Sequence, residues 1–61
     1  METFVVWRKQ DTFLIAADNA IRAIQAAIAV SDGFAFEFNA APLSIYSDKV
    51  QAKIRANALA I

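Results

Sequence analysis

Residues Asp18 to Ser31, DNAIRAIQAAIAVS, form the segment around which the rest of the chain is expected to be arranged. Ile21, Ile24 and Ile28 recur at spacings of three and four residues, which places their side chains on one face of an α-helix. We therefore predict a central helix here, with its isoleucine face packed against the rest of the domain.

The predicted helix has clear end signals and an unusual opposite side. Asp18 is a suitable N-cap, because its carboxylate can accept from the free backbone N–H groups of the first turn. Gly33 is a natural stop, since glycine reaches the left-handed conformation at little cost. A surface helix is normally polar opposite its apolar face, but here that side is mostly apolar. Either alanine serves there simply as a helix former, or a second partner packs on that side. It carries Ala23, Ala26, Ala29 and Val30.

The composition indicates one small domain, residues 1–61, that needs additional stabilisation. A chain of 61 residues buries only about 60% of the surface of its unfolded state. Disulfides, metals and oligomerisation are the common remedies. The sequence has no cysteine and no histidine, so disulfides, thiolate metal sites and the commonest metal ligand are excluded. Because 59% of the residues are hydrophobic, where about 45–50% is usual, oligomerisation is the expected remedy.

Charge and hydropathy argue against two kinds of partner. The chain has six acidic and six basic residues and no net charge, whereas nucleic-acid-binding domains normally have a basic excess. No charge-free run approaches the roughly 20 apolar residues of a membrane span. The first residues, METFVVWRK, lack the basic start of a signal peptide. A cytoplasmic protein with no membrane contact is therefore expected.

Four short runs are predicted to be strands. Thr3–Arg8 and Thr12–Ala16 are rich in β-branched and aromatic residues. Phe34–Phe38, FAFEF, alternates cleanly and is the clearest strand pattern, with its three phenylalanines on one face. Leu43–Tyr46 is predicted as a fourth strand. Asn39–Pro42 is predicted as the turn before it, because proline cannot donate to a sheet ladder.

A second helix is predicted to follow Ser47, whose hydroxyl can cap its first turn. Its buried stripe would be Val50, Ile54, Ala58 and Ile61. Each half of the chain, residues 3–31 and 33–61, then has the order strand, strand, helix. We therefore predict an α+β fold of two ββα units in tandem, ββαββα, with one antiparallel sheet and both helices on one face.

A competing fold uses longer helices. If Thr12 caps the first helix, the second strand is lost, and Pro42 could likewise begin a helix that runs to Ile61. The fold would then be βαβα, with two strands per chain and a sheet completed by dimerisation. The ββα version is favoured because Thr12–Ile15 and Ser44–Ser47 are poor helix stretches.

The ββα version predicts an interface. If both helices cover one sheet face, the other face is apolar and aromatic, and nothing in the chain remains to cover it. Exposed surfaces of this kind mark interaction sites. The alternative is that Trp7 folds over a sheet edge and covers the core of its own chain. We expect a homodimer, formed either through this sheet face or through the alanine-rich side of the central helix. The predicted contact residues are Val5, Trp7, Leu14 and Tyr46 on the sheet, and Ala23, Ala26 and Val30 on the helix.

A second hypothesis uses the same aromatic residues to bind single-stranded nucleic acid. Trp7 and Tyr46 could stack on bases, although a basic strip on a helix is more often simply solvated. The neutral net charge also disfavours this function. The supporting cations would be Arg8, Lys9, Lys49, Lys53 and Arg55.

No residue pattern indicates an enzyme, a cofactor or a metal. The carboxylates are scattered, and no nucleophile, base and orienting group occur together. Asp32-Gly33 is a turn signal rather than a phosphate loop, because the chain has a single glycine. The expected function is therefore that of a small, non-enzymatic interaction or structural protein that associates with itself.

Overall fold

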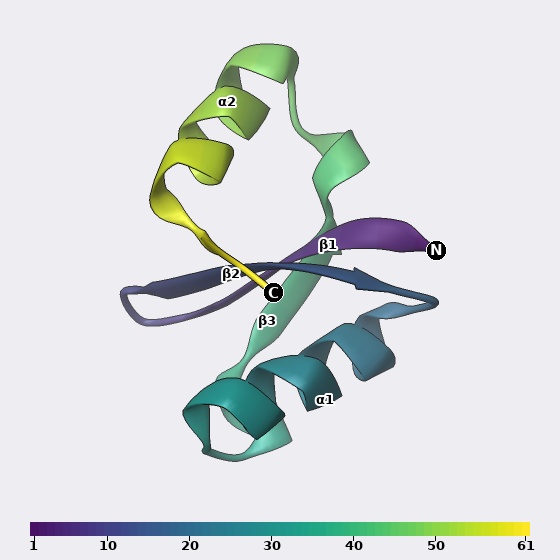
Figure 1. Ribbon diagram of the computed structural model, residues 1–61, viewed down its shortest axis with the longest axis vertical. Coiled ribbons are helices and arrows are strands. Elements are labelled where there is room, and N and C mark those ends of the chain that lie inside the picture. Colours follow the sequence, from purple (N-terminus) through teal and green to yellow (C-terminus); the bar gives the residue numbers. More distant parts are fainter.

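The computed structural model describes all residues from 1 to 61 and confirms the α+β class (Figure 1). A four-stranded sheet is accompanied by two α-helices and two short 3-10 helices, η1 and η2. In chain order the elements are β1 (Glu2–Arg8), β2 (Asp11–Ala17), α1 (Ala20–Ser31), η1 (Ala35–Glu37), β3 (Asn39–Pro42), η2 (Leu43–Ile45), α2 (Asp48–Asn57) and β4 (Leu59–Ala60).

The sheet is mixed, with the strand order β3-β1-β2-β4. β1 and β2 form an antiparallel hairpin in which Glu2 lies opposite Ala17 and Arg8 opposite Asp11. β3 pairs antiparallel with the other edge of β1, whereas β4 runs parallel to β2. The expectation of an antiparallel sheet is therefore wrong at β4, which reaches the β2 edge only after the chain has passed through α2.

The first half of the chain has the predicted order ββα, and α1 begins one residue later than expected. Asn19, not Asp18, is the N-cap, and its side-chain oxygen accepts from the backbone N–H of Arg22 at 2.9 Å. α1 ends at Ser31, and the C-cap Asp32 donates its N–H to the Ile28 carbonyl at 2.8 Å. Because Thr12–Ala16 lies within β2, the competing βαβα fold is excluded.

α1 packs closest to the sheet with its alanines, and Ile24 and Ile28 pack beside them, partly buried. Ala23 and Ala27 are fully buried, whereas the side of Ile21 is open and that residue is 70% exposed. The most buried positions lie one residue before the predicted Ile24 and Ile28, so the helix is rotated from the predicted orientation by less than one residue step, which is about 100°. The reason is size: the facing sheet surface is filled by large side chains, so only small helix residues allow close approach. The sheet contributes Phe4, Val6, Phe13 and Ile15 to this core.

The predicted strand Phe34–Phe38 is wrong, because this segment contains the 3-10 helix η1. Glu37 bends back, and its carboxylate accepts from the backbone N–H of Phe34 at 2.8 Å. This closes a turn in a sequence whose alternation is typical of a strand. Of the three phenylalanines, only Phe38 joins the core.

The strand that pairs with β1 comes instead from Asn39–Pro42, the predicted turn. Pro42 is tolerated there because β3 is an edge strand. The predicted strand Leu43–Tyr46 is also wrong: it contains η2, with Leu43 buried and the Tyr46 N–H donating to the Leu43 carbonyl at 3.2 Å. The second half therefore has one extended segment before its helix, not two.

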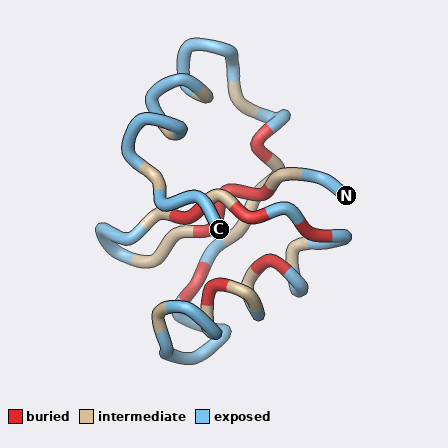
Figure 2. Tube along the Cα trace, in the orientation of Figure 1, coloured by how far each residue is buried: buried red, intermediate tan, exposed pale blue.

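α2 is capped as predicted, since the Ser47 hydroxyl accepts from the backbone N–H of Val50 at 3.3 Å. The placement of both helices on one sheet face is not confirmed. In Figure 1 the β1–β2 hairpin passes between α1 and α2, and no α2 residue belongs to the core that α1 forms with the sheet. No residue of α2 is buried, and Figure 2 shows it exposed along most of its length.

The packing of α1 predicts a strong effect of side-chain size at Ala27. We expect Ala27→Leu to lower the free energy of unfolding by about 1–3 kcal/mol, because the added atoms have no space beneath the phenylalanines. Ala29 is exposed on the same helix, so the matched change Ala29→Leu should alter it by less than about 0.5 kcal/mol. Urea unfolding followed by circular dichroism measures both; equal effects would contradict the observed orientation of α1.

Candidate interaction site

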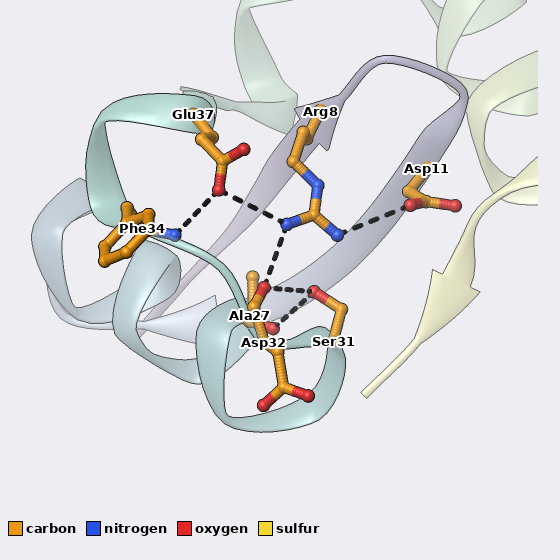
Figure 3. Close-up of polar contacts among 7 residues, drawn as sticks. All are labelled: Arg8, Asp11, Ala27, Ser31, Asp32, Phe34 and Glu37. Carbon is orange, nitrogen blue, oxygen red and sulfur yellow. Dashed lines mark hydrogen bonds and ion pairs between the residues drawn. The ribbon is translucent and has the colours of Figure 1, made fainter.

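Arg8, at the end of β1, is the centre of a polar cluster that joins three segments (Figure 3). Its Nη1 donates to the backbone carbonyl of Asp32 at 2.9 Å and lies 3.8 Å from the Glu37 carboxylate. Its Nη2 lies 3.6 Å from the Asp11 carboxylate. Since its side chain is only 17% exposed, Arg8 fastens the end of α1 and the turn of η1 to the hairpin.

Arg8 also covers the core directly. Its guanidinium carbon lies 4.6 Å from the centre of the Phe38 ring, and such a cation–π contact contributes about 0.5–2 kcal/mol. The pair with Asp11 is longer than a hydrogen bond, and Asp11 is exposed, so it contributes at most about 1 kcal/mol. The Asp32 hydrogen bond and the Phe38 contact are therefore the main interactions of Arg8.

Gly33 makes this close arrangement sterically feasible. Its φ of 109° lies in the region that favours glycine. A Cβ atom at this position would collide with the guanidinium of Arg8 and with the carboxylate of Glu37. The only glycine of the chain thus lets the backbone pass beside the cluster.

The cluster holds a pair of exposed aromatic side chains. Phe34 is 68% exposed and Phe36 is 86% exposed. Their rings are stacked, with centroids 5.6 Å apart and an interplanar angle of 10°. The backbone that carries them is fixed by the Glu37–Phe34 hydrogen bond and by the contact of Glu37 with Arg8. We call Phe34 and Phe36 the aromatic pair.

Sequence reasoning missed the aromatic pair because it assigned both residues to the buried face of a strand. The overlooked signal is Glu37, which stands three residues after Phe34. An acidic residue three positions after a helix start can accept from the first backbone N–H of the turn. Together with the preceding Gly33, this spacing is compatible with a short helical turn.

The structure disperses the predicted interface residues. Val5 is buried within the chain, as is Ala23. The sheet face that carries Val5 is partly covered by η2, which contacts β1 and contains the buried Leu43. Only Val30 of the predicted set remains largely exposed. The half-buried members are Trp7, Leu14, Ala26 and Tyr46.

The residues of the nucleic-acid hypothesis are likewise spread over several elements. Arg8 is occupied by the cluster described above. Lys9 lies in the turn between β1 and β2. Trp7 and Tyr46 are half-buried rather than displayed. The remaining cations are exposed on α2: Lys49, Lys53 and Arg55.

One open depression of about 270 Å³ lies between the start of β1 and α2. Two of its polar side chains are engaged within the chain: the Ser44 hydroxyl donates to Glu2 at 3.2 Å, and the Gln51 amide donates to the Tyr46 carbonyl at 2.8 Å. The structure contains no group of three or more acidic, cysteine or histidine side chains that could hold a metal ion. Neither helix has the length and apolar character required to cross a bilayer.

Comparison with known proteins found no matching family model, no similar curated protein and no similar solved structure. The aromatic pair, and the anchoring cluster that Arg8 forms with Asp11, Asp32 and Glu37, are therefore interpreted from their geometry and chemistry alone.

The anchoring role of Arg8 predicts a local and a global effect of its removal. We expect Arg8→Met to lower the free energy of unfolding by about 1–3 kcal/mol, because it removes a charged hydrogen bond to the Asp32 carbonyl. Amide exchange at Phe34 should also become faster, because Glu37 loses its cation. The matched control is Arg22→Met, since Arg22 is exposed and its side chain forms no ion pair. Unchanged exchange at Phe34 in Arg8→Met would show that the turn is held without Arg8.

Proposed function

We propose that this chain is a small, non-enzymatic interaction protein that associates with copies of itself. The observation that supports this best is the aromatic pair, which is exposed to solvent on a turn closed by the hydrogen bond from the Phe34 N–H to the Glu37 carboxylate. Exposed apolar patches mark interaction sites, and a turn that is already formed loses less entropy on binding than a flexible loop.

Other exposed residues support association. The chain leaves nine large hydrophobic residues exposed, while only ten of its 61 residues are buried. A core of this size gives a marginally stable domain, so burial of further apolar surface between copies would stabilise the fold. The net charge is zero, and proteins without net charge have little long-range repulsion between copies.

The aromatic pair is not sufficient for a stable complex. Burying a phenylalanine side chain contributes about 1.5–3 kcal/mol, so two contribute about 3–6 kcal/mol. A micromolar complex requires about 8 kcal/mol of net binding free energy, after several kcal/mol have been lost to immobilisation. The proposed interface must therefore include apolar residues beyond Phe34 and Phe36.

Binding of single-stranded nucleic acid has less support. Its aromatic residues, Trp7 and Tyr46, are half-buried. The exposed aromatic pair lies instead beside the carboxylate of Glu37 and follows Asp32 in the chain. Carboxylates at this position would repel a phosphate backbone.

Self-association through the aromatic pair predicts that Phe36→Ser weakens assembly without unfolding the protein. We expect the dissociation constant to rise at least about tenfold, as for a residue at the centre of an interface. The melting temperature should change little, because Phe36 is largely exposed. Sedimentation equilibrium from micromolar to millimolar concentration measures the association.

The matched control is Ile21→Ser. Ile21 is also exposed, but it lies at the opposite end of α1 from η1, so this change should leave association nearly unaltered. A wild-type chain that remains monomeric over the whole concentration range, and still unfolds cooperatively, would overturn the proposed function.

A further inference from the structure

The chain has no net charge, but its acidic and basic residues are unevenly distributed along the sequence. Residues 18–38, which include α1 and η1, contain three carboxylates and one guanidinium, a net charge of −2. Residues 39–61, which include α2, contain three cations and one carboxylate, a net charge of +2. The β1–β2 hairpin contains two charges of each sign. Its Arg8 contacts Asp32 and Glu37, and its Glu2 accepts from Ser44, so these two residues reduce the charges of the two parts to −1 and +1.

The fold converts this distribution into two oppositely charged ends. In Figure 1, α1 and η1 lie at one end of the longest axis and α2 lies at the other, with the hairpin between them. The molecule extends 30 Å along this axis. We call these the acidic end and the basic end.

Each end also exposes large apolar side chains. The acidic end exposes the aromatic pair and Val30. The basic end exposes Ile45 in η2 and Val50 in α2, beside the exposed lysines Lys49 and Lys53. Leu59 and Ile61 are exposed in the segment that follows α2.

We propose that the basic end of one copy docks on the acidic end of the next, so that the protein associates head to tail. This inference rests on the proposed function and names the two surfaces and their pairing. The apolar residues of both ends supply the affinity that the aromatic pair alone lacks. Opposite charges around them favour the unlike ends and set the orientation of encounter.

The charge distribution also argues against the simplest alternative, a twofold dimer. A twofold interface places the same surface of both copies together. A contact between two acidic ends, or between two basic ends, would bring like charges together. A head-to-tail contact avoids this repulsion, and it leaves one free end of each kind, so that it extends into a ring or an open chain.

The proposal is tested with two variants that each disable one end. Phe34→Ser with Phe36→Ser removes the apolar surface of the acidic end. Ile45→Ser with Lys53→Glu removes apolar surface and reverses a charge at the basic end. All four residues are exposed, and circular dichroism verifies that each variant folds. Sedimentation velocity of each variant, and of an equimolar mixture, reads out the assembly.

Head-to-tail association predicts wild-type species that grow beyond a dimer as concentration rises. Each variant alone should be monomeric, since one of its ends cannot bind. The mixture should form a one-to-one complex and stop there, because only one intact acidic end and one intact basic end are present. A mixture that stays monomeric would overturn the pairing of ends.

Other outcomes separate this inference from the proposed function. If the basic-end variant still forms a dimer by itself, the aromatic pair binds its own copy, and self-association stands while head-to-tail pairing falls. If the wild type is monomeric at every concentration, both the proposed self-association and the head-to-tail pairing are overturned. As a matched charge control, Arg22→Glu makes the acidic end more acidic and should preserve or strengthen association, whereas Lys53→Glu alone should weaken it.

Discussion

The close contact between the alanine face of α1 and the phenylalanine-bearing face of the β1–β2 hairpin determines the position of the other segments. Ala23 and Ala27 are small enough for the helix backbone to approach large side chains on the sheet. This approach brings the end of α1 to the end of β1, where Arg8 reaches the Asp32 carbonyl. It also turns Ile21 away from the core. The same packing thus creates the anchoring cluster and leaves apolar surface outside.

The anchoring cluster shows how a partly buried arginine can order a loop that has almost no core of its own. η1 has no buried residue, so polar contacts rather than apolar packing hold its turn. The guanidinium instead holds a backbone carbonyl, a carboxylate and an aromatic ring. The carboxylate of Glu37 then fixes the backbone of Phe34. The turn fixed by these contacts exposes the stacked side chains of Phe34 and Phe36 to solvent.

The sequence was informative where local preference and packing agree. Thr3–Arg8 and Thr12–Ala16 form β1 and β2 as predicted, because their β-branched and aromatic residues suit a half-buried hairpin. The Ser47 cap was also recognisable, since a hydroxyl before a helix start has a local role. These features depend on neighbouring residues, which a single sequence displays directly.

The second half was mispredicted where long-range contacts decide the structure. FAFEF alternates like a strand, but Phe38 alone enters the core, because Arg8 and Glu37 hold the preceding turn. The chain pairs with β1 only from Asn39, a segment whose composition favours a turn. Sequence reasoning therefore expected Phe34 and Phe36 inside the sheet, whereas the structure leaves both exposed on a turn. The partners that position the aromatic pair are distant in the sequence and could not be read from its local pattern.

The attachment of α2 has a consequence for the dynamics of the molecule. This helix has no buried residue. After it, the chain returns to the sheet through the short strand β4 and a hydrogen bond from the Ile61 N–H to the Leu14 carbonyl at 3.0 Å. Segments with few buried apolar contacts open at a lower free energy than the global unfolding of a protein. The hairpin with α1 is therefore expected to be the more persistent cooperative unit, and α2 is expected to exchange its amide protons through local opening while that unit stays folded.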